Sequence, residues 1–126
     1  MATILIVEDN EKNMKLVRDL LQHRGHQTLE AADGETGVRL ALGQPRPELI
    51  LMDIQLPDID GMTALARIRA EPALRAVPCL AVSASVMPDE QQRITVSGFD
   101  GFIPKPISLK PFLAAVDAAL AKGRAG

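Results

Sequence analysis

Residues 49–61, LILMDIQLPDIDG, give the clearest indication of the fold. Its apolar run reaches an acid at Asp53, and two more acids follow at Asp58 and Asp60. A short apolar run that ends in turn residues is typical of a strand buried on both faces of a sheet. A buried strand that ends on a carboxylate has two interpretations. Either the acids solvate a turn, or Asp53 does chemistry at the end of the strand.

Apolar runs of the same kind recur along the chain and alternate with segments of helical periodicity. The sequence predicts strands over residues 3–7, 27–31, 48–53, 79–83 and 101–104. It predicts helices that begin at residue 10 or 11 and end near Gly25, and then over 35–42, 61–70, 88–96 and 109–122. Strands this apolar, separated by helices, favour a parallel sheet covered on both faces. Right-handed crossovers then give an α/β, doubly wound, three-layer sandwich of five strands and five helices.

Length and composition exclude several classes of protein. A chain of 126 residues with 47% hydrophobic and 24% charged residues fits one globular domain with its own core. A formal net charge of -2 supplies no basic field for nucleic acid or an anionic membrane. The single cysteine, Cys79, excludes an intramolecular disulfide and is expected to be a small buried hydrophobe.

The sequence predicts neither a signal peptide nor a membrane span. The N-terminal segment MATILIVEDN has no basic region before its apolar run, and no apolar run approaches the roughly 18 residues of a membrane span. We therefore expect a cytoplasmic protein that neither enters a membrane nor binds nucleic acid directly.

Chemistry-bearing residues follow four of the five predicted strands. They are Glu8 and Asp9 after the first, Asp53 at the end of the third, Ser83 at the end of the fourth, and Lys105-Pro106 after the fifth. In open α/β sheets, ligands bind beyond the carboxyl ends of the strands. A single acid after a strand is a common turn residue, but a coherent set at one sheet edge indicates a site.

The charges of this set indicate the chemistry. Three carboxylates brought together raise one another's pKa unless a cation joins them. Mg²⁺ suits such a site, because it accepts carboxylate, water and phosphate oxygens. A carboxylate such as Asp53 can also act as a nucleophile that forms an acyl phosphate. Lys105 and the Ser83 hydroxyl could then neutralise the remaining phosphoryl oxygens.

The whole pattern resembles the response-regulator receiver domain of two-component signalling. The resemblance is carried by Glu8-Asp9, Asp53, Ser83-Ala84, Phe102 and Lys105-Pro106, in this order, and covers nearly the whole chain. It implies a flavodoxin-like sheet with strand order 2-1-3-4-5. It also implies a receiver domain over residues 1–122, followed by a frayed tail at 123–126.

The resemblance implies a role for each residue of the set. Asp53 is expected to accept a phosphoryl group from a histidine kinase or a histidine phosphotransfer protein. Mg²⁺ would be held by Glu8, Asp9, Asp53 and the backbone carbonyl of Gln55. Lys105 would pair with the phosphoryl group, and a cis peptide bond at Pro106 would aim this lysine. The domain would be a signalling switch, not an enzyme with its own substrate, although it catalyses its own phosphoryl transfer and dephosphorylation.

The resemblance also implies a switch and a means of tuning it. Ser83 would move toward the phosphoryl group, and Phe102 would swing into the space that Ser83 leaves. Gln55 and Ser85 match positions where the family tunes the lifetime of the phosphoryl group. Many relatives have Tyr where this chain has Phe102, and the chain contains no Tyr or Trp. The switch should therefore work by packing and not by a hydroxyl hydrogen bond.

Output is expected to be a protein contact made by a monomer or weak dimer. One candidate surface for docking a kinase surrounds the first helix, at Asn10, Glu11, Asn13, Met14 and Val17. The other is the face of the fourth helix, fifth strand and last helix, near residues 88–96, Phe102 and Ile107. Phosphorylation would change the second face through Ser83 and Phe102.

Several rival interpretations of the same residues are weaker than this one. A small Mg²⁺-dependent phosphatase could use Asp58 within DIDGMT, although Leu56-Pro57 separates that acid from the strand. An EF-hand loop fails, because the required position of Gly61 leaves Leu56 and Arg67 where acids are needed. His23 and His26 are a weak metal pair without a third ligand. A phosphorylation-independent adaptor has no need to keep three repelling carboxylates together.

Overall fold

Five parallel strands form one sheet in this computed structural model, which describes residues 2–84 and 87–122. The strands are β1 (Thr3–Val7), β2 (Gln27–Ala31), β3 (Leu49–Asp53), β4 (Cys79–Ser83) and β5 (Gly101–Pro104), in the order β2-β1-β3-β4-β5. The predicted flavodoxin-like fold is confirmed. Strand β3 begins one residue later than predicted, because Glu48 lies beside β1, where its carboxylate accepts a hydrogen bond from the Thr3 N–H (3.0 Å).

The register of the strands brings their carboxyl ends to one edge. Val7 pairs with Met52, Asp53 with Val82, and Ser83 with Pro104. The sheet grows outward in both directions from β1 and β3, so the strand order reverses between these two strands. In folds of this class the ligand crevice lies at that reversal, beyond the strand ends.

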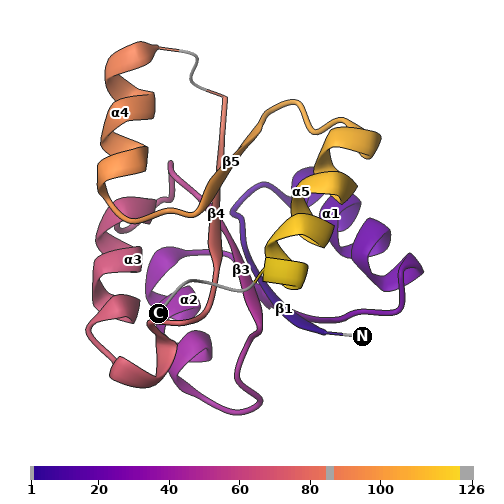
Figure 1. Cartoon of the computed structure of the whole chain (residues 1–126), viewed down its shortest axis with the longest axis horizontal. Helices are drawn as coiled ribbons and strands as arrows, with labels where there is room; N and C mark the ends of the chain where they lie inside the picture. Colours follow the sequence, from indigo (N-terminus) through magenta and orange to yellow (C-terminus); the bar gives the residue numbers. More distant parts are fainter. Residues whose placement is uncertain (1, 85–86, 123–126) are drawn as a thin grey trace.

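Helices cover both faces of the sheet (Figure 1). Helices α1 (Glu11–His23) and α5 (Leu109–Lys122) lie on one face. Helices α2 (Gly34–Leu42), α3 (Gly61–Arg69) and α4 (Pro88–Val96) lie on the other. Within the described residues, none of these helices is long and apolar enough to cross a membrane. With two helices on one face of the sheet and three on the other, the structure matches the predicted three-layer sandwich.

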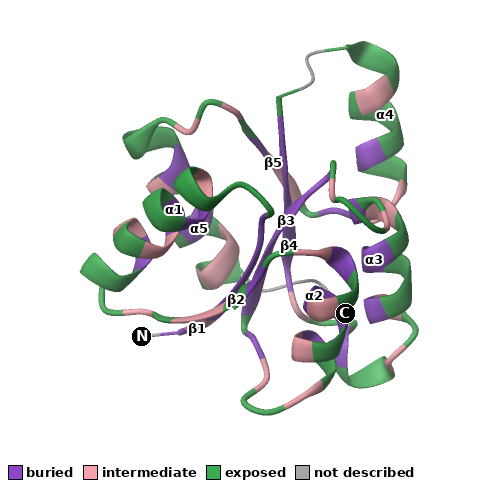
Figure 2. Cartoon of the chain, turned by 180° about the vertical axis from the view of Figure 1, so that it is seen from behind, coloured by how far each residue is buried: buried purple, intermediate pink, exposed green. Residues whose placement is uncertain are grey.

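Two apolar cores follow from the alternation of side chains along the strands. Ile4 and Ile6 of β1 point to the α1/α5 layer, whereas Leu5 and Val7 point to the layer of α2, α3 and α4. All five residues of β3 are buried, as Figure 2 shows for the centre of the sheet. Full burial of one large aliphatic side chain contributes about 1.5–3 kcal/mol, so the two cores dominate the stability of the fold.

Helix α1 uses its apolar stripe to contact the sheet. Met14, Val17 and Leu21 are buried at the helical spacing that the sequence predicts. The prediction that Met14 and Val17 lie on an exposed docking surface is therefore wrong. Leu16 is the exposed large hydrophobic residue of this helix. The helix ends before Gly25, which takes a φ of 87° that other residues rarely adopt.

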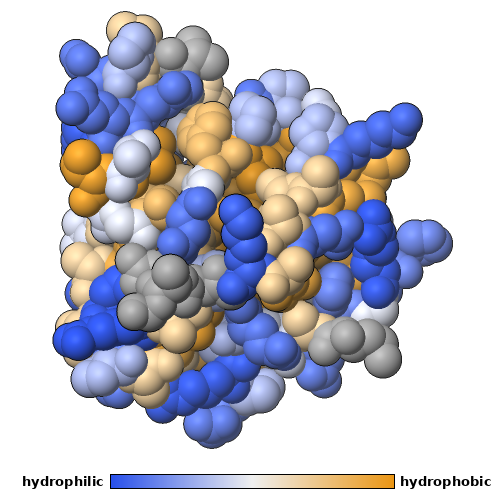
Figure 3. Space-filling model, viewed as in Figure 1, coloured by the Kyte–Doolittle hydropathy of each residue, from blue (hydrophilic) through white to orange (hydrophobic). Residues whose placement is uncertain are grey.

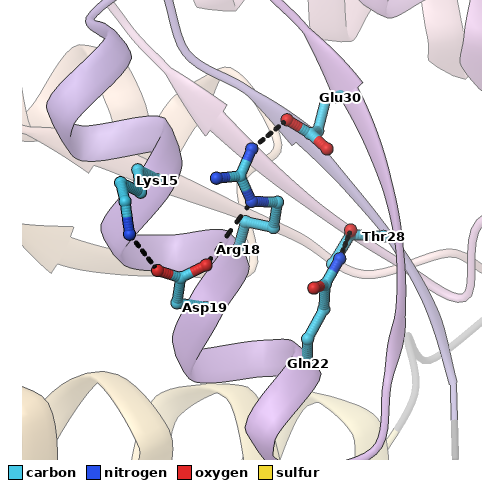
Figure 4. Close-up of polar contacts among 6 residues, drawn as sticks. All are labelled: Lys15, Arg18, Asp19, Gln22, Thr28 and Glu30. Carbon is cyan, nitrogen blue, oxygen red and sulfur yellow. Dashed lines mark hydrogen bonds and ion pairs between the residues drawn. The ribbon is translucent and has the colours of Figure 1, made fainter.

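Polar contacts join the outer side of α1 to the edge strand β2 (Figure 4). Arg18 pairs with Glu30 (3.1 Å), Gln22 donates to the Thr28 hydroxyl (2.9 Å), and Lys15 pairs with Asp19 within the helix (2.7 Å). These side chains are exposed or half-buried, and ion pairs open to solvent contribute little to stability. The position of α1 on the sheet therefore depends mainly on its buried stripe.

Polar side chains cap the N-termini of α1, α2 and α3. Asn10, Asp33 and Asp60 accept hydrogen bonds from the N–H groups of Asn13, Thr36 and Thr63, respectively, at 2.7–3.0 Å. Because Asp33 is the cap, α2 begins at Gly34, one residue earlier than predicted. Helix α3 ends at Arg69, one residue earlier than predicted, and a short 3-10 helix, η1 (Pro72–Leu74), follows without having been predicted.

Candidate functional site

A lysine and two carboxylates meet where β1, β3 and β5 end. Lys105, which follows β5, places its Nζ 2.8 Å from Asp53 Oδ2 and 3.0 Å from Glu8 Oε1. Asp53 is the last residue of β3, and Glu8 directly follows β1. Only the strand register brings these residues together, since more than forty residues separate each of them in the sequence.

Three acids form the centre of the site. Ligand oxygens of Glu8, Asp9 and Asp53 all lie within 4.8 Å of one another. Glu8 and Asp53 are 4% exposed, whereas Asp9 is open to solvent. They face a hollow of about 250 Å³ whose lining is strongly polar and consists of Glu8, Asp9, Asn10, Asn13, Asp53, Gln55, Ser83, Ala84 and Lys105.

The structure thus brings together most of the predicted site residues. Asn10 and Asn13 were not predicted to line the hollow, because they were assigned to a docking surface. The signal for them was present, since α1 begins directly after Asp9 and its first turn must face the same sheet edge. Ser85, which was predicted to tune the phosphoryl lifetime, lies outside the described residues.

The charges of the site explain how buried carboxylates are tolerated. Burial raises the pKa of Glu8 above its usual value, and the nearby charge of Asp53 raises it further. Burial works to lower the pKa of Lys105, but its hydrogen bonds to Asp53 and Glu8 outweigh that effect, so its pKa lies above the usual value. The lysine therefore stays charged and compensates the two buried acids.

Backbone groups hold these side chains in place. The Gln55 N–H donates to Asp53 Oδ1 (3.0 Å), and the Asn10 N–H donates to Glu8 Oε2 (3.0 Å). The Lys105 N–H donates to the Ser83 carbonyl (2.9 Å), which ties the ends of β4 and β5 together. The Lys105–Pro106 peptide bond is cis. A second cis bond, Gln44–Pro45, was not predicted.

The loop between β3 and α3, residues 54–60, folds tightly under Asp53. The Gly61 N–H donates to the Ile54 carbonyl (2.9 Å), and a Cβ at Gly61 would lie 2.4 Å from the Asp53 carbonyl oxygen. Only glycine fits at this close approach. The end of the loop at Gly61 therefore packs directly against the backbone of Asp53, the phosphoacceptor candidate.

Asp58 lies in this loop but faces away from the acid cluster. Its Oδ1 accepts a hydrogen bond from the Gly34 N–H and its Oδ2 one from the Glu35 N–H, both at 2.8 Å. The hydrogen bonds from Glu35 and Gly34 lower the pKa of Asp58 to about 2, despite a partly opposing effect of desolvation. Both oxygens are thus engaged at the N-terminus of α2, which argues against a nucleophilic Asp58.

Ser83 and Phe102 lie on the paired strands β4 and β5, two register positions apart. Ser83 is buried at the end of β4 and lines the acidic hollow. Phe102 lies on β5, opposite Ala81 of β4, and is half-buried against the core below α4. Phe102 is among the residues that line a hollow beside α4 and another beside α5.

The donor set fits a hard divalent cation. Carboxylate oxygens of Glu8, Asp9 and Asp53 converge, Gln55 lines the same hollow, and no thiol or imidazole contributes among the described residues that line it. Oxygen-only sites with carboxylates suit Mg²⁺. A cation there would also compensate acids that otherwise depend on Lys105 alone.

Comparison with known proteins agrees with this site. The response regulator receiver domain family matches residues 4–117. A response regulator structure from Chloroflexus aurantiacus superposes with a TM-score of 0.89 at 26% identity, and covers 95% of this chain and 98% of its own. The receiver domain of a sensor histidine kinase from Pseudomonas aeruginosa, solved with a magnesium ion in its active site cleft, has a TM-score of 0.88 at 30% identity and the same coverage.

The chain therefore belongs to the response regulator receiver domain family. Among named relatives it is similar to the polar-differentiation response regulator DivK of Brucella anthropi, with 40% identity over 118 residues, which are 94% of this chain and 95% of that protein. DivK of Brucella ovis is 39% identical over the same length. A likeness to DivK is predicted from LILMDIQLPDIDG, VEDNEKNMKL and FIPKPIS, and the identity over 118 residues confirms the likeness.

Proposed function

We propose that this receiver is a phosphorylation switch in which Asp53 accepts a phosphoryl group from the phosphohistidine of a kinase or phosphotransfer protein. The observation that carries the proposal is the position of Asp53. It is buried at a strand end, hydrogen-bonded to Lys105 Nζ at 2.8 Å, and clustered with Glu8 and Asp9. Family membership and the site geometry together favour this function over a generic acidic turn.

The transfer exchanges one bond to phosphorus for another. A carboxylate oxygen of Asp53 attacks the phosphorus, the P–N bond of the phosphohistidine breaks, and its electron pair returns to the imidazole. When bound, Mg²⁺ supplies positive charge for the phosphoryl oxygens. Glu8, Asp9, Asp53 and the Gln55 carbonyl would hold it. Lys105 stays within reach of the phosphoryl group, and the buried Ser83 hydroxyl can donate to a further oxygen.

The same site would remove the phosphoryl group. Hydrolysis of the acyl phosphate needs a water that reaches the phosphorus from the open side of the hollow, where Asp9 is exposed. Gln55 lines that hollow, which supports its proposed role in setting the phosphoryl lifetime. Ser85 would help to set the same lifetime. This self-catalysed turnover makes the protein a transient switch.

The output would leave through β4 and β5. Ser83 is tied to Lys105 through its backbone carbonyl, and Phe102 lies two residues before Pro104, the strand partner of Ser83. A shift of Ser83 toward a phosphoryl group would therefore favour a new packing of Phe102, and with it of α4. The face of α4, β5 and α5 would then contact the downstream protein.

The phosphodonor would dock on the opposite side of the hollow. Asn10, Glu11 and Asn13 lie on the first turn of α1, next to the acids, and Leu16 adds an exposed apolar side chain one turn on. This phosphoryl transfer would take place in the cytoplasm.

Intact mass after incubation with acetyl phosphate tests the proposal. We expect a Mg²⁺-dependent gain of one phosphoryl group, about 80 Da, that is labile in wild type and absent in Asp53→Asn. Asp33→Asn serves as the control, because it changes an acid that caps α2 outside the acidic hollow and should still be phosphorylated. Phosphate incorporation in Asp53→Asn would overturn the assignment. Turnover of a simple phosphate ester that survives Asp53→Asn and is lost in Asp58→Asn would favour a phosphatase instead.

A further inference from the structure

We propose that Asp58 is a positioning residue for the metal site, which holds the β3–α3 loop, residues 54–60, on the N-terminus of α2 so that the Gln55 carbonyl faces the acid cluster. This inference rests on the proposed function, because it assigns a support to the same metal site. It gives Asp58 a role that the acid cluster itself does not include.

Asp58 completes the cap of a helix to which it does not belong. The first N–H groups of a helix have no partner within the helix. In α2, Asp33 accepts from the Thr36 N–H (2.7 Å), as a usual N-cap residue does. Asp58 accepts from the two preceding N–H groups, those of Gly34 and Glu35, at 2.8 Å each. Two carboxylates, one local and one from the loop, therefore satisfy one helix terminus.

Close packing makes this contact a firm one. A Cβ at Gly34 would lie 2.4 Å from Ile59 Cγ1 and 3.2 Å from Asp58 Oδ1. The backbone of α2 thus touches the loop at the point where Asp58 binds. Glu35 also pairs with Arg67 of α3, although this ion pair is exposed and contributes little to stability. Displacement of the loop would break contacts on α2 as well as in the loop.

The loop connects this contact to the metal site over a short path. Gln55 is three residues before Asp58, and its N–H donates to Asp53 Oδ1. The Ile54 carbonyl and the Gly61 N–H close the loop at its base. With the base closed and the middle held on α2, the backbone between them has few conformations available. Loss of the Asp58 contact would release the middle of the loop and, with it, the orientation of the Gln55 carbonyl.

A purely structural role for Asp58 makes a different prediction. If Asp58 only stabilised α2, removal of either cap would lower stability and leave metal binding unchanged. Outer partners that orient metal ligands typically cost about 10–100-fold in metal affinity when they are removed. We expect the lower end of this range for Asp58→Ala, about tenfold, since it acts through a backbone carbonyl.

The experiment compares Asp58→Ala with Asp33→Ala in the full chain. Asp33→Ala is the matched control, because it removes a carboxylate cap from the same helix terminus without touching the loop. Mg²⁺ affinity is measured by calorimetric titration, and the amide signal of Gln55 is followed by NMR as the metal is added. Denaturant unfolding checks that each variant is folded at the titration temperature.

The expected result is a loss of Mg²⁺ affinity of about tenfold for Asp58→Ala, with Asp33→Ala within about twofold of wild type. Asp58→Asn, which keeps one acceptor oxygen, should fall between them and remains available if Asp58→Ala does not fold. Gly34→Ala pushes on the same contact from α2 and should weaken Mg²⁺ binding in the same direction. Equal affinities for Asp58→Ala and wild type, or equal losses in both cap variants, would overturn the proposal.

The outcome separates this inference from the proposed function. If wild type binds Mg²⁺ but takes up no phosphoryl group, the switch is wrong and the role of Asp58 is still decided by the titration. If wild type is phosphorylated and Asp58→Ala binds Mg²⁺ as wild type does, only the role of Asp58 is wrong. If wild type binds no Mg²⁺, both are wrong.

Discussion

Helices α3 and α4 have the same length and comparable positions, but the fold holds them very differently. Each has nine residues and follows a strand that ends in a site residue, Asp53 for α3 and Ser83 for α4. Helix α3 buries Gly61, Ala64, Leu65 and Ile68, whereas α4 buries only Ile94. Figure 2 shows the same contrast along the two helices.

The surroundings of the two helices extend this contrast. The loop that enters α3 is closed at its base and bonded to α2, whereas Met87 and Val96 at the two ends of α4 are 64% and 75% exposed. In Figure 3, α4 is mostly hydrophilic on the visible face, with a hydrophobic area between it and α5. Elements with few buried apolar contacts open at low free energy. The metal side of the site is therefore held more firmly than the Ser83 side, as the proposed switch requires.

The largest expected effect of this difference is on stability. Ile68→Ala should cost about 3–5 kcal/mol, because Ile68 is fully buried between α3 and the sheet. Ile94→Ala should cost less than half of that, roughly 1–2 kcal/mol, because Ile94 borders a hollow of about 240 Å³ and leaves fewer contacts unfilled. Denaturant unfolding followed by circular dichroism measures both, since the chain has no tryptophan. Equal costs would show that α4 is held as firmly as α3.

Hydrogen exchange should show the same ordering without a mutation. Amides in the middle of α4 should exchange at least about tenfold faster than those of α3, which corresponds to about 1.4 kcal/mol in opening free energy. NMR exchange rates on the wild-type protein measure this directly. Protection of α4 equal to that of α3 would remove the basis for a mobile output helix.

Phosphorylation should act on the two helices unequally. Acetyl phosphate with Mg²⁺ should shift the amide signals of α4 and Phe102 more than those of α3, because in the proposed switch Ser83 would transmit the change along β4 and β5. Phe102→Ala should keep the phosphoryl group and reduce the shifts in α4. Asp53→Asn is the control, which should show no shifts beyond those of Mg²⁺ itself. Larger shifts in α3 than in α4 would reverse the comparison.

A smaller effect is the pH dependence of the contact between Asp58 and the N-terminus of α2. The folded-state pKa of Asp58 is about 2, below its unfolded value near 3.9, so its contact stabilises the fold above pH 4 and is lost as the pH falls toward 2. The amide signals of Gly34 and Glu35 should titrate with a midpoint near 2. In Asp58→Asn this titration should disappear, and the unfolding free energies of the two proteins should converge over the same pH window. A midpoint near 4 would show that the contact is weak.

Most of the sheet could be predicted from the sequence because its strands are buried on both faces. Such strands require continuous apolar runs, so TILIV, LILMD and CLAVS show their role without reference to their partners. Asp53 stands out for the same reason, since a carboxylate at the end of such a run has no packing role. The turn at Gly61 can also be predicted from the local sequence. The structure adds why a glycine is needed there, since a Cβ would collide with the Asp53 carbonyl oxygen.

Contacts between distant segments could not be predicted in the same way. The sequence indicates that Asp58 belongs to a turn, but the N-terminus of α2 that it binds lies more than twenty residues earlier. The burial of Met14 and Val17 depends on which side of α1 meets the sheet, and the sequence alone allowed a surface role for them. The 3-10 helix η1 is too short to give a periodic signal.

The strands, the strand-end acids and the family can be inferred from local properties of the chain, because apolar runs and the turn residues that end them do not depend on distant segments. Three features require the folded structure: Lys105 lies between Glu8 and Asp53, Asp58 bonds to α2, and α4 is loosely held. These features depend on the register of parallel strands and on the distances between helices. Both are set by the packing of the whole chain, which no single stretch of sequence contains.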